Sequence, residues 1–273
     1  MKTIVVTGVT SGVGRALVEV LCEKGEKVIG IGRSPDKLDR LKNALEDYEE
    51  NLHLYQADLA DMASVDDVIN RITDDFPFGI DVLINNAAIV PKYKRMSADG
   101  FELQYQVNHL MPLYFSHRLE PLLRKRKGTI ITTSSGAHKK AIFDKYDLQA
   151  LKKYHAVRSY TRTKLYNLMI AQVLKEKYHP DINVFTVHPG RVKTEIGTKD
   201  TSLLYAFLWR LFTRKGFTPR EATKTYLYLI YGQTIDQDAL YFYNANPASY
   251  SSLVNIQDSE ALYAISMRQL NLK

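Results

Sequence analysis

The chain has 273 residues, of which 45% are hydrophobic and 25% charged, as expected for a soluble globular protein with one large α/β domain or two small ones. A single cysteine excludes an intrachain disulfide, and no apolar run is long enough to span a bilayer. The net charge of +7 favours anionic ligands, such as cofactor phosphates or an acidic membrane surface.

Short β-branched runs alternate with amphipathic stretches along the whole chain. The predicted strands are Thr3–Thr7, Lys27–Ile31, Leu52–Gln56, Val82–Asn85, Thr129–Thr133, Ile182–Val187 and Tyr241–Tyr243. The predicted helices are Val13–Lys24, Pro35–Asp47, Ser64–Phe76, Gly100–Lys125, Leu151–Lys177 and Thr218–Tyr231. Continuous apolar strands separated by helices indicate a parallel sheet covered on both faces. We therefore predict an α/β fold, a single doubly wound Rossmann-type domain over residues 1–273 with about seven strands, whose ligands collect at the carboxyl ends of the strands.

The first strand ends in a glycine-rich turn that leads directly into a helix. Glycines there allow a tight turn and close approach of the backbone to a phosphate, and the free N–H groups of the helix start face the pyrophosphate. The candidate cofactor-binding residues of this turn are Thr7, Gly8, Thr10, Ser11, Gly12, Val13 and Gly14. The spacing Thr-Gly-x-x-x-Gly-x-Gly resembles the short-chain dehydrogenase/reductase family, and the resemblance extends over essentially the whole chain.

The end of the second strand predicts which nicotinamide cofactor is bound. An acidic residue there would bind the ribose 2′-OH of NAD, whereas an arginine accommodates the 2′-phosphate of NADP. The chain has no acid at this point but has Arg33, with Ser34 and Lys37 nearby. We expect NADP(H) to be preferred over NAD(H).

Two further strand ends complete the predicted cofactor wall. After the third strand come Asp58 and Leu59, and the resemblance implies that Asp58 contacts the adenine amino group; a helix N-cap is the alternative. After the fourth strand, Asn86, Ala87 and Ala88 follow the family pattern Asn-Asn-Ala-Gly, except that Ala88 replaces glycine. Asn85, the first asparagine of this pattern, is interpreted as structural.

Asn108 lies in the long predicted helix, four residues before Pro112. Because proline has no N–H, the carbonyl of residue 108 loses its i+4 donor and the helix should bend. The family resemblance implies that this carbonyl binds a water that links the active-site lysine to solvent. A simple kink for packing is the alternative.

Tyr160 and Lys164 are one turn apart on the same face of a predicted helix. A neighbouring cation favours the phenolate, so we expect Lys164 to lower the pKa of Tyr160. The resemblance implies that Tyr160 is the general acid that protonates a carbonyl oxygen, that Lys164 also binds the nicotinamide ribose, and that Ser135 donates to the same carbonyl oxygen. Ser134 is the alternative if the register shifts by one residue.

The residues that follow the sixth strand resemble the family's nicotinamide wall. The resemblance assigns Pro189, Gly190, Val192 and Thr194 to that wall, whereas His188 is interpreted as structural. No histidine shows metal-ligand spacing, and no metal is expected.

The 24 residues between Ser135 and Tyr160 resemble the retinol dehydrogenase-like branch of the family, which also includes WW-domain oxidoreductases. That branch acts on hydrophobic carbonyls or alcohols. Candidate substrate contacts in this insert are His138, Phe143, Tyr146 and Tyr154. The apolar segment 203–212, within a substrate-loop region of about 195–217, adds Leu204, Phe207 and Leu208 as a lid; a core helix, a dimer interface or a membrane contact are the alternatives.

The sequence therefore predicts an NADP(H)-dependent oxidoreductase that interconverts a carbonyl and an alcohol on a small-to-medium hydrophobic substrate. A dedicated retinoid or steroid dehydrogenase and a non-catalytic NADP(H)-binding redox sensor are the alternatives. Because no signal peptide is apparent, we expect a cytoplasmic protein, with peripheral membrane contact as an option. Nucleic acid is not an expected partner, since lysines and arginines are dispersed rather than interleaved with aromatics. The resemblance implies a homodimer or homotetramer paired through the helices Gly100–Lys125 and Leu151–Lys177.

Overall fold

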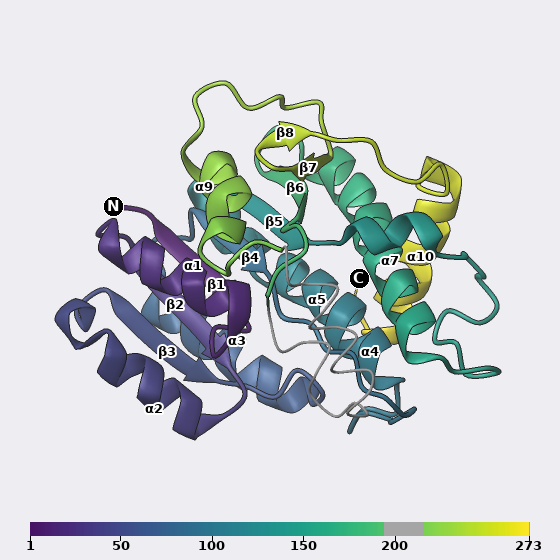
Figure 1. Cartoon of the computed structure of the whole chain (residues 1–273), viewed down its shortest axis with the longest axis horizontal. Helices are drawn as coiled ribbons and strands as arrows, with labels where there is room; N and C mark the ends of the chain where they lie inside the picture. The colour runs from purple at the N-terminus through teal and green to yellow at the C-terminus, as the bar shows by residue number, and fades with distance from the viewer. Residues whose placement is uncertain (194–215, 273) are drawn as a thin grey trace.

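The structure is a computed structural model and describes residues 1–193 and 216–272. Its centre is one sheet with the strand order β3-β2-β1-β4-β5-β6-β7-β8 (Figure 1). The strands are β1 (Thr3–Thr7), β2 (Lys27–Gly32), β3 (Leu52–Gln56), β4 (Val82–Asn85), β5 (Thr129–Thr133), β6 (Asn183–His188), β7 (Tyr241–Tyr243) and β8 (Asn246–Pro247). The first seven pair in parallel, and β8 pairs antiparallel with β7. The strand order reverses beside β1, so the crevice between the ends of β1 and β4 is where a doubly wound sheet binds its ligand.

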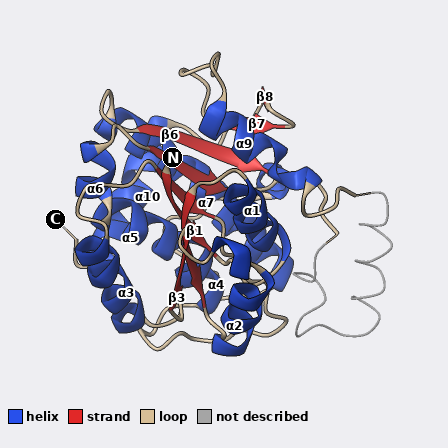
Figure 2. Ribbon diagram, turned by 90° about the vertical axis from the view of Figure 1, so that its left-hand side faces the viewer, coloured by secondary structure: helices blue, strands red, loops and turns tan. Residues whose placement is uncertain are grey.

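Helices cover both faces of the sheet (Figure 2). Their bounds are α1 (Gly12–Glu23), α2 (Pro35–Ala44), η1 (Glu46–Tyr48), α3 (Met62–Asp75), α4 (Leu103–Tyr105), η2 (Gln106–Leu110), α5 (Met111–Arg118), α6 (Glu120–Lys125), η3 (Gly136–Lys140), α7 (Ala156–Tyr178), η5 (Glu221–Thr223), α9 (Lys224–Tyr231) and α10 (Ile256–Gln269). Two buried clusters separate by face: one is formed with α1, α2 and α9, and the other with α3, α5, α7 and α10. The predicted fold class, a single doubly wound α/β domain, is confirmed.

The helix predicted at Gly100–Lys125 is divided into four segments. Its middle segment, η2, is a π-helix, in which Met111 N–H donates to the carbonyl of Gln106, five residues earlier. Pro112 follows at the start of α5. Because Pro112 has no N–H, it offers no donor to residue 108 in an α register or to residue 107 in a π register. The predicted bend therefore takes the form of a wider helical turn at Asn108.

The C-terminal helix α10 was not among the predicted elements. It packs along α7, where Ser259 donates to the side chain of Gln172, and it reaches η2, where Ser266 bonds His109 at 2.9 Å. Leu262 and Met267 are its buried apolar residues. As a result α10 lies on the two helices through which pairing was predicted.

Candidate active site

The turn after β1 is built for close approach of backbone groups. Gly8 has φ +76°, and a Cβ on Gly14 would lie 2.3 Å from the carbonyl oxygen of Gly8. The N-cap residue Ser11 makes no side-chain capping bond, and the first turn of α1 holds no acidic residue. The N–H groups at the start of α1 are therefore available to an anion, and the turn fits a cofactor pyrophosphate.

The end of β4 is fixed to the end of β1 by side-chain hydrogen bonds. The Thr7 hydroxyl accepts from the N–H groups of Asn86 and Ala87 at 3.0 and 3.1 Å, and the Asn86 amide donates to the carbonyl of Thr7. Asn85 is buried, and its amide donates to Pro112 O and Ser116 Oγ. Thr7 therefore sets the shape of the crevice through its bonds to the backbone of β4, and Asn85 joins β4 to α5.

The predicted 2′-phosphate residues lie at the carboxyl end of β2. Arg33 and Lys37 are exposed, and Ser34 is the N-cap of α2 without a side-chain capping bond. Asp58 Oδ1 accepts from Ala60 N–H at 3.0 Å, so one carboxylate oxygen shapes the turn after β3, while Leu59 is buried. The ends of β2 and β3 thus bring two basic side chains and one acidic side chain to the same edge of the sheet as the glycine turn.

The side chain of Asn108 is fully buried and bonds both main-chain groups of Ile89, and its Nδ2 also donates to Thr163 Oγ1 at 3.4 Å. Its Oδ1 accepts from Ile89 N–H at 2.8 Å, and its Nδ2 donates to Ile89 O at 2.9 Å. This pair of bonds fixes the chain that follows β4 against the π-helix. With the amide committed in this way, only the main chain of Asn108 remains for contact with a water or ligand.

The two serines after β5 have different environments. Ser134 is buried and its hydroxyl donates to the carbonyl of Lys164 at 2.7 Å. Ser135 is only partly buried, and its hydroxyl accepts from Ala137 N–H at 3.2 Å. Its hydroxyl also forms a hydrogen bond with Tyr160, so Ser135 lies beside the phenol and is the serine that fits the substrate role.

Tyr160 and Lys164 lie together, but the electrostatics differ from the prediction. The Lys164 ammonium is 5.6 Å from the centroid of the Tyr160 ring. Burial raises the pKa of Tyr160, and a hydrogen bond with Ser135 partly offsets this effect. Burial also lowers the pKa of Lys164 to about 7. We expected Lys164 to lower the pKa of Tyr160, and for the protein without its cofactor this expectation is wrong. Burial lowers the pKa of Lys164, so its side chain is less fully charged near neutral pH and stabilises the phenolate less.

Lys164 is held by a network that the sequence did not indicate. Its Nζ donates to the carbonyl of Thr133 at 2.9 Å, and the same carbonyl accepts from Asn167 Nδ2 at 3.2 Å. The Thr133 hydroxyl bonds the hydroxyl of Tyr226 at 2.8 Å, and the Tyr226 side chain is fully buried. The end of β5 is thus joined to α7 and α9 directly behind Tyr160. Only the position of Asn167, three residues after Lys164, could have suggested this network from the sequence.

The turn that follows β6 packs against Phe217. Gly190 has φ +89°, and a Cβ there would lie 2.5 Å from the Phe217 ring. Val192 forms a parallel bridge with Phe217, and Lys193 N–H donates to Phe217 O at 2.9 Å. His188 Nδ1 accepts from Gly190 N–H, which agrees with a structural role. Pro189 precedes this turn, and Thr194 lies outside the described residues.

Of the predicted substrate residues in the insert, most are engaged elsewhere. His138 is fully buried, and its two ring nitrogens bond Ser135 O and Ser251 N–H. Tyr146 is 82% exposed, and the Tyr154 hydroxyl donates to Pro91 O at 2.7 Å. Phe143 packs edge-on against Tyr166 of the core. The other candidates, Leu204, Phe207 and Leu208, lie in the segment 203–212, outside the described residues.

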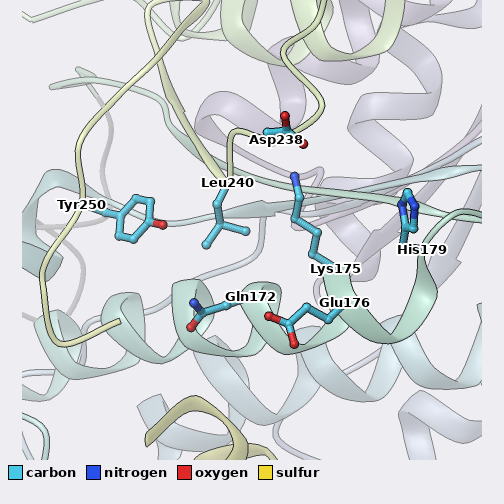
Figure 3. A pocket seen from close by; sticks show the side chains of 7 residues that line it. All are labelled: Gln172, Lys175, Glu176, His179, Asp238, Leu240 and Tyr250. Carbon is cyan, nitrogen blue, oxygen red and sulfur yellow. The ribbon is translucent and has the colours of Figure 1, made fainter. Parts of the chain in front are cut away.

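A hollow of about 460 Å³ lies away from these residues, between the C-terminal half of α7 and the chain before β7 and after β8 (Figure 3). It is lined by Gln172, Lys175, Glu176, His179, Asp238, Leu240 and Tyr250. Lys175 lies eleven positions after Lys164, which corresponds to about 16 Å along the helix. Lys175 Nζ already donates to Ala239 O at 3.0 Å. The hollow therefore lies apart from the predicted catalytic residues Asn108, Ser135, Tyr160 and Lys164, which we call the catalytic set.

The described residues contain neither a metal-binding cluster nor a membrane-spanning helix. They hold no group of three or more histidine, cysteine or carboxylate side chains able to bind a metal. Among their helices, none combines the length and apolar character needed to cross a membrane.

A glycine turn at the switch point of a parallel sheet, with a tyrosine and a lysine over the neighbouring strand ends, defines a nucleotide-binding oxidoreductase of the α/β class. The family model described as short chain dehydrogenase matches residues 2–203, and the chain belongs to this family. It lies in the retinol dehydrogenase-like branch and is an NAD(P)-dependent short-chain dehydrogenase/reductase.

Three comparisons illustrate the relationship. The chain is 32% identical over 208 residues to a protein of Streptomyces sp. (strain C5) named as a daunorubicin C-13 ketoreductase, with 75% of this chain and 70% of the relative covered. It is 30% identical over 234 residues to retinol dehydrogenase 11 of Mus musculus, with 83% and 72% covered. A short-chain dehydrogenase of Burkholderia cenocepacia J2315, solved in complex with NADP, has the same fold with a TM-score of 0.69, 22% identity and coverage of 89% and 96%.

Proposed function

We propose that the protein is an NADP(H)-dependent oxidoreductase that interconverts a carbonyl and an alcohol on a small-to-medium hydrophobic substrate. The single observation that carries this proposal is the position of Tyr160, beside the Ser135 hydroxyl and the Lys164 ammonium, over the carboxyl end of β5. A ketoreductase and a retinol dehydrogenase among the relatives support the reaction class.

In the reducing direction, Ser135 and Tyr160 donate hydrogen bonds to the carbonyl oxygen of the substrate. Bound NADPH supplies the hydride. Tyr160 then gives its proton to the developing alkoxide. The raised pKa of Tyr160 keeps the phenol protonated until that point, and the transfer proceeds because an alkoxide is a stronger base than a phenolate. Lys164 is held by Thr133 O on the side facing the sheet, and its remaining protons are free to bind the nicotinamide ribose. Asn108 would take part through its main-chain carbonyl and a water.

Replacement of Tyr160 by phenylalanine tests this role directly. The variant retains the ring but cannot donate a proton, so kcat should fall at least about a hundredfold. NADPH binding, measured by fluorescence titration, should persist. The assay screens aldehydes and ketones by NADPH absorbance. Full activity of Tyr160→Phe on a good substrate would rule out this mechanism.

The proposed preference for NADP(H) depends on Arg33 at the end of β2. An arginine that pairs with the 2′-phosphate contributes about 1.5–3 kcal/mol, so Arg33→Ala should weaken NADPH binding roughly ten- to a hundredfold and leave NADH binding unchanged. Arg40→Ala, another exposed arginine, which lies inside α2, is the matched control and should change neither affinity. An equal loss for both cofactors, or a wild-type protein that binds NADH as tightly, would contradict the preference.

Two other functions are separated by the same assays. A redox sensor would bind NADPH tightly and turn over no carbonyl in the screen. A dedicated retinoid or steroid dehydrogenase would turn over those substrates alone.

A further inference from the structure

Lysines and arginines occur along the whole chain, but the excess of positive over negative charge comes from two segments. The segments 91–96 and 139–158 together hold nine lysines and arginines and two aspartates, an excess of seven positive charges. The whole chain has 37 basic and 30 acidic residues, an excess of the same size, so all other residues together hold 28 of each sign. The remainder of the molecule is therefore neutral, and the basic character belongs to these two segments.

The second segment begins in η3, where Lys139 donates to Ser249 at 3.2 Å, and its later part meets the first segment beside α4 (Figure 1). The Tyr154 hydroxyl donates to Pro91 O at 2.7 Å, and Gln104 at the α4 end donates to the same hydroxyl at 2.9 Å. Glu102 N–H donates to Gln149 at 2.8 Å, while Glu102 also bridges to Met96. These contacts make one continuous surface of the two segments, which we call the basic loop face.

The charges of the basic loop face are exposed and the acids within it are engaged. The nine basic residues, all exposed, are Lys92, Lys94, Arg95, Lys139, Lys140, Lys145, Lys152, Lys153 and Arg158. The two aspartates accept hydrogen bonds from the loop backbone, Asp144 from Tyr146 N–H and Asp147 from Leu151 N–H. Nine positive charges against these two carboxylates leave the potential of the face positive.

Exposed apolar side chains are interspersed with these charges. Six of the thirteen large exposed hydrophobic residues among the described residues lie on this face: Tyr93, Met96, Ile142, Tyr146, Leu151 and Val157. Ile142 is 66% exposed and Tyr146 82% exposed. Exposed apolar groups gathered in one place mark an interaction surface.

We propose that the basic loop face docks on the surface of a membrane that contains anionic lipids. Lysines provide seven of the nine charges, and lysine acts as a point charge that suits a diffuse anionic surface, whereas the paired recognition of individual phosphates in nucleic acid favours arginine. Aliphatic and tyrosine side chains beside the lysines suit insertion at the headgroup level, whereas the phosphate backbone of a nucleic acid would leave the aliphatic ones exposed to water. The insert 136–159, which joins Ser135 to Tyr160, would then lie against the lipid, next to a source of hydrophobic substrate.

The test is co-sedimentation of the full chain with vesicles, which requires neither turnover nor a known substrate. Binding is expected to vesicles of phosphatidylcholine with about 30% phosphatidylserine but not to phosphatidylcholine alone. It should weaken as salt rises from about 0.05 M to about 0.5 M. Absence of binding, or equal binding to the neutral vesicles, would overturn the proposal.

Two variants of equal charge change assign the binding to a surface. Lys145→Gln/Lys152→Gln/Lys153→Gln should reduce affinity for the anionic vesicles on the order of a hundredfold, since each basic residue near such a surface contributes roughly fivefold. Lys42→Gln/Lys127→Gln/Lys224→Gln removes three exposed lysines elsewhere and should have a much smaller effect. Equal losses in the two variants would overturn the assignment to this face.

A third variant and a competitor test the kind of partner. Ile142→Ser/Tyr146→Ser keeps every charge and should still weaken vesicle binding at least tenfold; unchanged binding would overturn insertion into the lipid. Duplex DNA is the competing polyanion. Tighter binding to DNA than to the anionic vesicles at equal salt would overturn the lipid assignment in favour of nucleic acid.

Discussion

At the scale of single residues, the predicted catalytic residues Asn108 and Lys164 and the neighbouring Ser134 are held mainly by main-chain groups. Asn108 binds both backbone groups of Ile89, Ser134 binds the carbonyl of Lys164, and Lys164 binds the carbonyl of Thr133. A main-chain partner is present whatever side chain stands at that position, so these contacts could not be read from residue types. Spacing did indicate which side chains come together, because Tyr160 and Lys164 share a helix face and Ser135 ends the neighbouring strand.

The buried ammonium of Lys164 makes stability depend on pH in the cofactor-free protein. Its pKa is about 7 in the folded protein against an ordinary value of 10.5. Between these two pH values Lys164 is protonated in the unfolded chain but neutral in the folded protein, so the free energy of unfolding rises with pH. Below pH 7 Lys164 is charged in both states, and the free-energy cost of burying its ammonium is constant. Lys164→Met removes this cost. Its gain in unfolding free energy over wild type should be largest at or below pH 7 and should shrink by on the order of 1 kcal/mol per pH unit above it.

Urea unfolding of both proteins between about pH 6 and about pH 9 measures this difference. Lys224→Met, at an exposed position of α9, is the control, and its difference from wild type should not vary with pH over this range. Parallel curves for Lys164→Met and wild type would show that the Lys164 ammonium stays charged in the folded protein.

At the scale of elements, the parallel strands were predictable and the helix interruptions were not. The seven parallel strands begin and end within a residue of prediction because each is a short apolar run with no competing pattern. The helix start at Leu151 was wrong, since α7 begins at Ala156, and the π-helix at Gln106–Leu110 has no periodicity of its own. The C-terminal α10 has a weak apolar stripe, since only Ser259, Leu262, Ser266 and Met267 of its residues are buried, and half of these are serines.

The contact between α9 and β5 gives a test at this scale. Tyr226→Phe leaves the Thr133 hydroxyl without its bond inside the protein, and a buried polar group without a partner costs about 1–3 kcal/mol of stability. Thr133→Val has the reciprocal effect on the Tyr226 hydroxyl. In the double variant both polar groups are gone, so the loss of stability should be smaller than the sum of the two single losses by about 0.5–3 kcal/mol. Urea unfolding of the four proteins measures this coupling, and additive losses would mean that the two hydroxyls do not stabilise one another.

At the scale of the whole molecule, the helices expected to pair with a second copy are already covered within one chain. Every residue is described in the stretches 101–120 and 161–174, and none of them is exposed. Helices without an exposed residue over these stretches offer little free surface to a partner, although some of their residues are half-buried. Part of the covering comes from α10, which packs on α7 and hydrogen-bonds η2. Pairing through these helices would require α10 to leave both, exposing Leu262 and Met267.

We therefore expect that the protein does not dimerise through these helices. Light scattering should give a mass of 31.2 kDa over a wide range of concentrations. The physical reason is the cost of displacing α10: burial of one leucine or methionine contributes about 1.5–3 kcal/mol, and two such residues and several hydrogen bonds would be lost before any contact with a partner formed. Chemical cross-linking separates this expectation from pairing elsewhere. A stable species of twice the mass, with cross-links that join Lys177 of α7 in the two copies, would contradict it. A dimer whose cross-links lie only at β8 would leave α10 in place and the helix face closed.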